Sequence, residues 1–351
     1  MPSPGRLTPP TAITVESPSR LHLGFIDPNG SLGRTFGSIG LAIDAHATRI
    51  TARQAPASRR NDPRIEGTTS DAQRARIAHY LKQLHTALGE NEEDGPTIDI
   101  EVHETPRPHT GLGSGTQLAL ALGTAFARVK GHAASTADIA RILARGARSG
   151  IGIHGFDHGG LIVDGGRNAS TTTSTALPPL IARQPFPEAW RVLLIDDTSR
   201  EGLHGDEEKR GLASLAPFPA TLAAHLSHLV LMRILPAVAE HDFDTFADAI
   251  CDMQHTIGEY FAPVQGGVFA SPAVARALEA VAAEQKAGIG QTSWGPVGFA
   301  FVASTQDAER ARAAAERVSQ GAPLAFTLAA GRNRGATWRA AEPRQHGANA
   351  A

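Results

Sequence analysis

The sequence predicts a mixed α+β fold in two halves, and three observations support this prediction. Apolar and polar residues alternate over residues 12–27 and 37–53, which indicates long strands near the N-terminus. Apolar residues at helical spacing dominate the second half instead. Between the halves, a Thr-, Ser- and Pro-rich piece from Asn168 to Pro187 is the best candidate for a linker. We therefore expect domains over residues 11–187 and 188–340, with loose termini at 1–10 and 341–351.

The other elements follow from local patterns. Ile77, Leu81, Leu84 and Leu88 have helical spacing, so we expect a helix from about Thr69 to Leu88. Further helices are expected to begin near Ser114 and at Ser135 or Thr136, the latter running to about Arg145. Short strands are expected at 96–104, 159–166, 190–197, 297–304 and 323–330, and helices at 218–241, 242–261, 271–288 and 307–320.

Composition and charge exclude several classes of protein. A net charge of -2, 5% aromatic residues and the lack of a basic patch argue against nucleic-acid binding. The single cysteine, Cys251, rules out an internal disulfide. No window approaches about 20 uncharged apolar residues, and the N-terminal stretch lacks the apolar run of a signal peptide. We therefore expect a cytoplasmic protein with no membrane span.

Three glycines in "TGLGSG", Gly111, Gly113 and Gly115, stand just before a predicted helix. Glycine lets the backbone take positive φ and approach a ligand closely. The first N–H groups of the helix lack intrahelical partners and carry the positive end of its dipole. The loop therefore predicts a phosphate or pyrophosphate site, helped by the side chains of Ser114, Thr116, Arg107 and His109. A tight strand-to-helix connection with Ser114 as an ordinary N-cap is the alternative, because a single glycine motif does not by itself define a phosphate site.

Three longer stretches of the sequence indicate a protein family more specifically than the glycine loop does. The loop is neither a P-loop nor a dinucleotide-binding turn, but "PxxxxGLGSG", Pro106 to Gly115, resembles the central motif of the GHMP kinase superfamily. The stretches Ser19–Asp44, Arg148–Arg167 and Gly288–Val302 narrow the resemblance to the β-ribofuranosylaminobenzene 5′-phosphate synthase family, over about residues 12–335. This resemblance implies a GHMP-kinase-like two-domain α+β fold, with an S5-like N-terminal half and a ferredoxin-like C-terminal half.

The resemblance also implies a reaction. Family members join 5-phosphoribosyl 1-pyrophosphate to 4-aminobenzoate or 4-hydroxybenzoate, releasing pyrophosphate and carbon dioxide early in methanopterin biosynthesis. The departing pyrophosphate needs positive charge, and the benzoate must be held with its ring carbon facing the ribose. We expect the pyrophosphate on residues Gly111 to Gln117, bridged by a divalent metal ion such as Mg²⁺. These small molecules are the expected partners.

Aspartates are the candidate ligands for the metal ion or its waters, although loop aspartates more often cap turns or helices. Asp27 is ambiguous, because Asp-Pro-Asn-Gly is itself a turn sequence. Asp157, in "HGFDHGG", resembles the catalytic Asp region of GHMP kinases. A metal site made of His154, Asp157 and His158 ranks below a solvated loop. Asp27 and Asp157 are predicted as catalytic, and Asp157 and Asp197 as metal ligands.

Arginines and hydrogen-bonding groups complete the predicted site. Arg34 and Arg148 are expected to bind phosphate together with the loop, through their planar guanidinium groups. His22, on a predicted strand, is a candidate general base for the para substituent, although a lone histidine is more often structural. Trp294 and Pro296 form a flat wall suited to an aromatic ring. The predicted substrate-binding residues are Arg20, His204, Gly205, Gln265, Gln291, Ser293 and Trp294.

Two other functions compete with this one. An ATP-dependent GHMP kinase would carry a second glycine-rich loop near the C-terminus, where this chain has "GQTSWGP". A catalytically silent, metabolite-binding GHMP protein would lack charged groups around the loop, yet Arg148, His109 and Asp157 are present. The apolar helices of the second half suit an interface, and we expect a homodimer.

Overall fold

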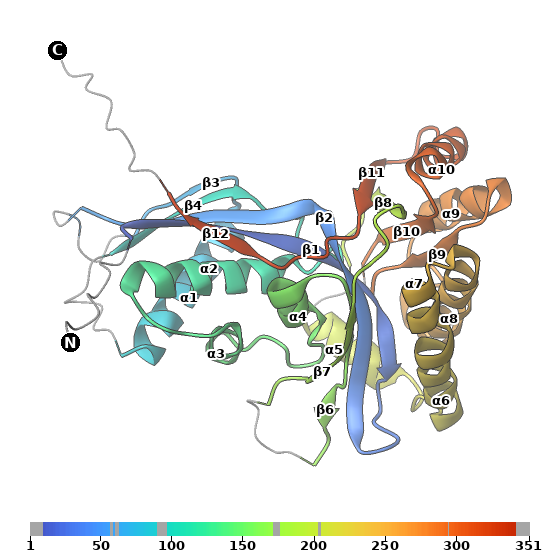
Figure 1. The fold of residues 1–351 in the computed structure, drawn as a ribbon, viewed down its shortest axis with the longest axis horizontal. Helices are drawn as coiled ribbons and strands as arrows, with labels where there is room; N and C mark the ends of the chain where they lie inside the picture. The colour runs from blue at the N-terminus through green and yellow to red at the C-terminus, as the bar shows by residue number, and fades with distance from the viewer. Residues whose placement is uncertain are drawn as a thin grey trace.

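Two antiparallel-rich sheets with helices packed against them make up the structure, a computed structural model that describes residues 10–56, 59, 63–89, 97–170, 176–202, 205–293 and 295–341 (Figure 1). The larger sheet runs in the order β12-β1-β2-β4-β3, and β2 also pairs with β5 and β6, while β7 pairs with β5. Its strands are β1 (Ala12–Asp27), β2 (Arg34–Gln54), β3 (Ile65–Gly67), β4 (Ile98–Glu104), β5 (Leu161–Asp164), β6 (Arg167–Asn168), β7 (Leu180–Gln184) and β12 (Thr337–Ala340).

Four helices cover one face of the larger sheet: α1 (Asp71–Ala87), α2 (Ser114–Lys130), α3 (Thr136–Ile142) and α4 (Ile151–His158) (Figure 1). A capping box between Ser70 and Gln73 starts α1, and Ser135 caps α3 in the same way with Asp138. Both ends of α2 are set by glycines at positive φ, Gly113 and Gly131. Most of α2 is buried, because it lies between β1, β2 and the other three helices.

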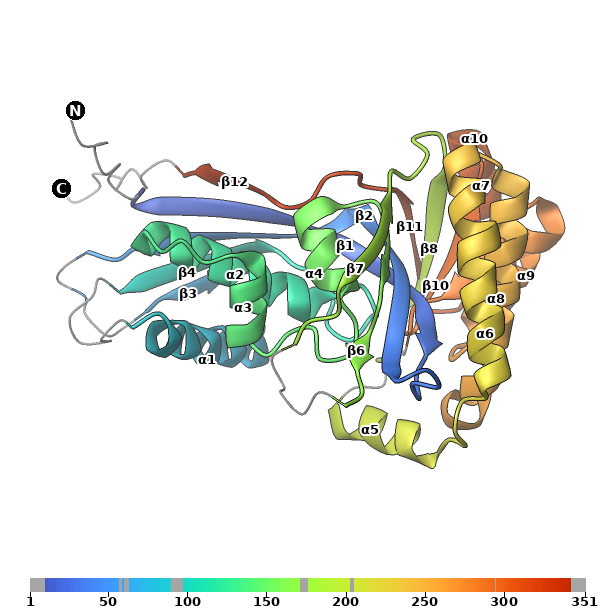
Figure 2. The same ribbon diagram turned by 60° about the horizontal axis from the view of Figure 1, so that its bottom comes forward.

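The smaller sheet has the order β11-β8-β10-β9, with helices on both of its faces (Figure 2). Its strands are β8 (Arg191–Asp197), β9 (Gly288–Gln291), β10 (Val297–Val302) and β11 (Leu324–Ala330). The helices of this half are α5 (Gly205–Ser214), α6 (Ala220–Leu229), α7 (Leu235–Glu240), α8 (Phe243–Gln265), α9 (Pro272–Glu284) and α10 (Thr305–Val318), and a π-helical turn, Val230–Ile234, joins α6 to α7.

One hydrophobic core crosses between the two halves. It combines Leu21 and Leu41 of β1 and β2 with Trp190, Phe246 and Phe301 of the second half. Phe246 makes ring contacts with both of these aromatic partners. A separate core lies under α1 and α2, and a third lies between the smaller sheet and helices α9 and α10. Because the first core is shared, the sheets are fixed relative to each other, and β1 passes through their junction.

Three sequence expectations need correction. The segment proposed as a linker contains the strand β7. This strand pairs with β5, with Leu161 opposite Gln184, so part of the proposed linker belongs to the larger sheet. The expected loop around Asp157 is the end of α4. Its beginning is fixed by the buried carboxylate of Asp164, which accepts a hydrogen bond from the Gly150 N–H at 2.8 Å. The helix after Ser135 ends at Ile142 instead of Arg145.

One apolar helical segment, Ala220–Glu240, is long enough to cross a membrane. It has a mean hydropathy of 1.5 and contains the charged residue Arg233, so it is not the uncharged apolar window that the sequence was expected to lack. Leu226 and Ile234 of this segment are fully buried in the shared core. Length and composition are weak support for a membrane span, because a core helix of a globular protein has the same properties.

Candidate active site

The glycine loop before α2 has the conformation that an anion site requires. Gly111 and Gly113 have φ values of 79° and 81°, which glycine adopts without the strain of a side chain. Gly113, and not Ser114, is the N-cap of α2, and no side chain caps the helix. The first N–H groups of α2 are therefore left for a ligand, as the anion-binding alternative predicts.

A second loop packs directly against this one. The Thr292 hydroxyl donates to the Thr110 carbonyl at 3.1 Å, and the Thr292 N–H donates to the Val297 carbonyl at 3.0 Å. A Cβ on Gly111 would collide with the Thr292 side chain, and one on Gly295 would collide with the Thr110 carbonyl. Thr292 is fully buried, and the sequence analysis did not single it out. Its neighbour Trp294, predicted as a flat wall, lies outside the described residues.

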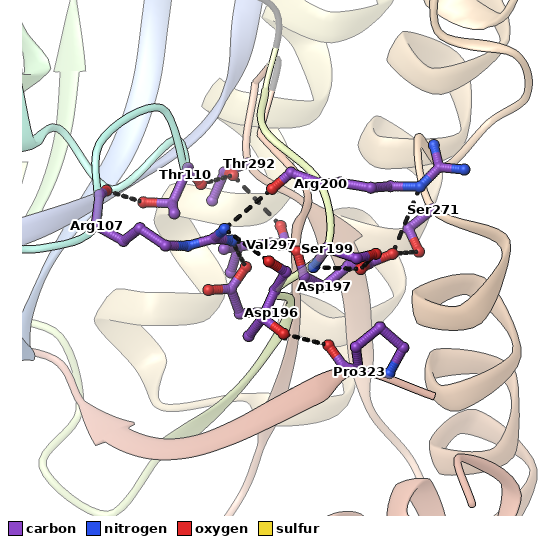
Figure 3. A network of polar contacts seen from close by, with 11 residues as sticks. Arg107, Thr110, Asp196, Asp197, Ser199, Arg200, Ser271, Thr292, Val297 and Pro323 are labelled. Atoms are coloured by element: carbon purple, nitrogen blue, oxygen red, sulfur yellow. Dashed lines mark hydrogen bonds and ion pairs between the residues drawn. The ribbon is translucent and has the colours of Figure 1, made fainter. Parts of the chain in front are cut away.

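Arg107 holds the glycine loop against the end of β8 (Figure 3). Its guanidinium donates to the Asp196 carboxylate at 2.6 Å and to the carbonyls of Asp197, Thr198 and Arg200 at 3.1 to 3.3 Å. The predicted rim cation is thus used to connect the two halves of the molecule. On the same side, the His109 carbonyl accepts a hydrogen bond from the Gly202 N–H at 2.9 Å.

Arg20 of β1 lies beneath the loop. Its Nη1 donates to the Gly111 carbonyl at 2.5 Å, and its buried Nε has no hydrogen-bond partner. A Cβ on Gly113 would lie 3.2 Å from that Nε, so the guanidinium is in contact with the loop backbone. Burial lowers the pKa of Arg20 to about 10, which leaves the side chain charged at neutral pH. Within the part of the chain that the structure describes, no carboxylate pairs with it.

His22 follows Arg20 on β1 and is 2% exposed. Its Nδ1 is 2.6 Å from the Ser293 hydroxyl, while its Nε2 is buried without a partner. Burial, helped by the positive charge of Arg20, holds the pKa of His22 well below its ordinary value of 6.5. His22 is therefore neutral at physiological pH, with one ring nitrogen left for a ligand.

An apolar pocket adjoins Ser293. It lies between α8, the end of β9 and β1, and is lined mainly by Leu23, Ile257, Gly258, Phe261, Val268 and Phe269. Glutamine side chains form part of its wall: the Gln291 amide donates to the Gln265 amide oxygen at 2.9 Å, and the Gln254 amide oxygen accepts from the Gln291 N–H at 3.0 Å. These bonds fix the amides in place. Of the predicted substrate-binding residues, Gln265, Gln291 and Ser293 are brought together here.

Other predicted residues lie elsewhere. Asp157 hydrogen-bonds Thr136 and lines a separate cavity of about 520 Å³, together with residues 124–128 of α2. That part of α2 begins ten residues after Ser114, about 15 Å along the helix at 1.5 Å per residue. The structure therefore does not place Asp157 at the loop, and its predicted catalytic and metal-binding roles stay predictions.

Asp27 and Arg34 lie in the hairpin between β1 and β2. Asp27 accepts hydrogen bonds from the Gly30 and Ser31 N–H groups at 2.8 and 2.7 Å, so it closes the turn. Arg34 donates to the carbonyls of Gly165 and Gly166 at 2.7 and 2.9 Å. Asp27 is seven residues from Arg20 along β1, which is about 20 Å in an extended strand. Both residues have structural partners, and their predicted roles stay predictions.

Asp197 is also committed to structural partners. Although burial raises the pKa of Asp197, hydrogen bonds from Ser199 and Ser271 outweigh it and lower the pKa below the ordinary value. Its two oxygens accept from those hydroxyls, both at 2.6 Å. In the residues that the structure describes, no group of three or more His, Cys, Asp or Glu side chains can hold a metal ion. A Mg²⁺ ion held mainly by pyrophosphate oxygens needs fewer protein ligands than such a group, and it stays a prediction.

The remaining predictions fall around the start of α2 or outside the description. Gln117 is buried and donates to the Gly152 carbonyl at 2.8 Å, and Thr116 contacts the same glycine, so these residues join α2 to α4. Arg148 lies in the turn before α4, and Gly205 opens α5 with open space around it. His204 is outside the described residues. For these residues the predicted roles stay predictions.

Two arginines at the loop escaped the sequence analysis. A Cβ on Gly115 would lie 3.7 Å from Arg76 Nη1 and 3.9 Å from Arg145 Nη1. Arg76 comes from α1, and Arg145 follows α3. Only the packing of these helices against α2 brings them to the glycine loop, and the sequence carries no local signal of it.

Comparison with known proteins defines the class of the fold. The family model described as the GHMP kinases N terminal domain matches residues 75–162, and the GHMP kinases C terminal model matches residues 234–320. Homoserine kinase from Cytophaga hutchinsonii superimposes with a TM-score of 0.66 over 97% of this chain and 100% of its own, at 13% identity. Mevalonate diphosphate decarboxylase from Staphylococcus aureus gives 0.66 over 94% and 98%, at 12% identity. The predicted GHMP-kinase-like fold is confirmed.

Sequence relatives narrow the assignment. A β-ribofuranosylphenol 5′-phosphate synthase from Archaeoglobus fulgidus is 36% identical over 69% of this chain and 75% of its own length. The protein of the same name from Methanothermobacter thermautotrophicus is 30% identical over 92% of this chain and 98% of its own. The chain belongs to the β-ribofuranosylphenol 5′-phosphate synthase family. The predicted family is thus confirmed, and the relatives' names specify a phenol.

Proposed function

We propose that this enzyme transfers the phosphoribosyl group of 5-phosphoribosyl 1-pyrophosphate to 4-hydroxybenzoate, with loss of carbon dioxide and pyrophosphate. The product is a β-ribofuranosylphenol 5′-phosphate, an early intermediate of methanopterin biosynthesis. The observation that carries the proposal is that one end of the site is positively charged and the other end is apolar. A cationic glycine loop with the buried Arg20 lies at one end, and an apolar pocket beyond Ser293 lies at the other. The names of the relatives favour the phenol product over the aminobenzene.

The bond changes match this arrangement. The bond between ribose C1 and the pyrophosphate oxygen breaks, and its electron pair leaves with the pyrophosphate. Ring carbon C1 of the benzoate then bonds to ribose C1. The ring carbon loses its carboxylate as carbon dioxide, and the electron pair of that bond restores the aromatic ring. Positive charge at the loop stabilises the departing anion, which is where charge develops in the transition state.

The apolar pocket is the proposed site of the benzoate ring. Its lining of leucine, isoleucine, valine and phenylalanine side chains suits a flat aromatic molecule. The free volume is only about 20 Å³, so these side chains must move apart when the ring binds. Neutral His22, whose Nδ1 is held by Ser293, has a free Nε2 that we assign to the acceptor as a general base. Proton removal from the para hydroxyl increases electron density at the ring carbon opposite.

A divalent metal ion such as Mg²⁺, bridging the pyrophosphate oxygens, stays part of the proposal, because such an ion needs only one or two protein carboxylates in addition to the substrate. The second candidate function, an ATP-dependent kinase, has less support. The loop at residues 292–297 is packed against the glycine loop through Thr292 and Gly295 instead of forming a second phosphate cradle.

Release of labelled carbon dioxide tests the proposal. Purified protein is incubated with phosphoribosyl pyrophosphate and carboxyl-labelled 4-hydroxybenzoate or 4-aminobenzoate, with and without Mg²⁺. We expect release with 4-hydroxybenzoate, reduced about 100-fold or more in Arg20→Met, since an interaction made to the leaving group is lost. Asp157→Asn is expected to retain the wild-type rate. No release with either benzoate, together with ATP consumption in the presence of a small alcohol, would favour the kinase instead.

A further inference from the structure

The start of α2 carries more positive charge than one phosphate group requires. Three guanidinium groups meet the glycine loop there: Arg20 at Gly113, and Arg76 and Arg145 at Gly115. They come from β1, from α1 and from the turn after α3, three elements that all pack around α2 (Figure 2). Three cations from separate elements thus converge on one half-buried stretch of backbone, where a bound anion would compensate their charge.

No carboxylate among the described residues neutralises any of the three arginines. Arg20 has a single partner, the Gly111 carbonyl, and its buried Nε has none. Arg145 donates to the Tyr80 hydroxyl at 2.5 Å and to the Leu143 carbonyl at 3.1 Å, both of them uncharged. Arg76 makes no hydrogen bond or ion pair with any residue that the structure describes. By contrast, Arg74 and Arg141, on the same two helical regions, pair with Asp71 and Asp138.

Tyr80 positions one of these cations. The guanidinium of Arg145 lies 5.3 Å from the centre of the Tyr80 ring as well as donating to its hydroxyl. Tyr80 is 3% exposed and belongs to the core under α1, so it is a rigid support. Arg145 is thereby held beside Gly115 before any ligand arrives, which reduces the entropy that binding must overcome.

The cations are divided between two places along the loop, as two phosphoryl groups of one anion would need. The Arg20 side chain lies beside Gly113, whereas a Cβ on Gly115, two residues further into α2, would lie 3.7 Å from Arg76 Nη1 and 3.9 Å from Arg145 Nη1. We propose that Arg76 and Arg145 bind the outer phosphoryl group of pyrophosphate while Arg20 and the Gly113 end of the loop bind the inner one. The choice of pyrophosphate rests on the proposed function, but the two-phosphoryl site can be tested without catalysis.

The test is calorimetric titration with inorganic pyrophosphate and, separately, orthophosphate. The wild-type protein is expected to bind pyrophosphate more tightly than orthophosphate. Arg76→Met and Arg145→Met should each weaken pyrophosphate binding by about 10- to 100-fold, the usual effect of one charge-assisted contact to phosphate. The same variants should bring the affinities for the two anions close together. Arg74→Met and Arg141→Met are the matched controls, and they should bind pyrophosphate as the wild type does.

Three results would overturn the inference: no pyrophosphate binding by the wild type, unchanged binding in Arg76→Met and Arg145→Met, or equal affinities of the wild type for both anions. Thermal denaturation of each variant verifies that it folds. If Arg145→Met is unstable, Arg76→Met still tests the inference, because Arg76 makes no hydrogen bond or ion pair with the described residues. Arginine-dependent pyrophosphate binding without labelled carbon dioxide release would retain this inference and reject the proposed reaction. Carbon dioxide release together with pyrophosphate binding that does not depend on Arg76 or Arg145 would support the proposed reaction and reject this inference.

Discussion

At the scale of single residues, the site depends on polar groups that the protein buries without satisfying them. Arg20 Nε and His22 Nε2 are both buried and lack a hydrogen-bond partner. Leaving such groups unpaired costs about 1–3 kcal/mol each, so the free enzyme gives up stability at this place. A ligand that supplies the missing partners recovers this free energy on binding. Buried atoms without a partner also occur elsewhere in the described residues, so it is the position of these two beside the glycine loop and Ser293 that marks them as part of the site.

The buried histidine gives a prediction for stability against pH. The pKa of His22 is lowered in the folded protein, so only the unfolded chain takes up a proton as the pH falls through about 6.5. Stability is thus complete above about pH 6.5 and falls on acidification, by up to about 1.4 kcal/mol per pH unit for this group. Urea denaturation between about pH 5 and 7.5 should show a shallower loss in His22→Gln.

The matched control for this measurement is His255→Gln, which changes a histidine with a 66% exposed side chain on α8. It should follow the wild-type curve more closely than His22→Gln does. Parallel curves for wild type and His22→Gln across the whole range would contradict a neutral, buried His22.

At the scale of elements, the structure packs two loops against each other and connects them to a strand. Thr292 holds the second loop on the glycine loop, and Arg107 holds the glycine loop on the end of β8. The backbone at residues 110–113 is therefore fixed from both sides before substrate binds. Preorganised N–H groups of this kind stabilise a developing anion without rearrangement during the reaction.

Gly111 is the residue where this packing is most restrictive. Gly111→Ala combines a positive φ with a collision against Thr292, and we expect it to destabilise the fold by about 2–4 kcal/mol. Gly89→Ala introduces an alanine at a similar φ, 71°, but into open space, and should cost only about 1 kcal/mol. Chemical denaturation of both variants measures the difference. Equal losses would show that the close approach of Thr292 is unimportant.

The Arg107 connection gives a second prediction at this scale. The four hydrogen bonds of Arg107 depend on the planar, forked shape of its guanidinium group, which lysine lacks. Arg107→Lys should therefore destabilise the protein about as much as Arg107→Met does. Because Arg107 and Asp196 are partly exposed, the loss of stability should be only about 1–2 kcal/mol. The rate of carbon dioxide release should fall by a larger factor than the folding equilibrium constant does. A lysine variant with the wild-type rate would show that charge alone is sufficient.

At the scale of the whole molecule, the sequence predicts the helices and strands better than it predicts which of them pack against each other. The period of two in β1 and β2 and the helical period of α1 follow from the chain itself, because burial on one face imposes them. Helix α4 was missed because glycines interrupt its pattern at Gly152 and Gly155, and β7 was hidden in a polar stretch. Family motifs supplied the fold and the glycine loop.

The candidate site was predictable only where its residues lie in those motifs. Arg20, His22, Ser293 and the glycines do, and the structure brings them together. Asp27 and Asp157 also lie in those motifs, and Asp197 was chosen for its carboxylate, yet each of the three has a structural hydrogen-bond partner. Arg76 and Arg145 could not be found, because helix packing and not sequence spacing brings them to Gly115. Tertiary structure therefore decides which charged residues serve the ligand.

The central claim is that the protein forms a carbon–carbon bond between ribose and a decarboxylated ring. The most direct measurement is a carbon NMR spectrum of the product made from phosphoribosyl pyrophosphate labelled at ribose C1 and 4-hydroxybenzoate labelled at the carboxyl-bearing ring carbon. A one-bond coupling between the two labelled carbons is the predicted result, with one carbon dioxide and one pyrophosphate released per product. A product without that coupling, such as an ester or an O-riboside that keeps its carboxylate, would contradict the account.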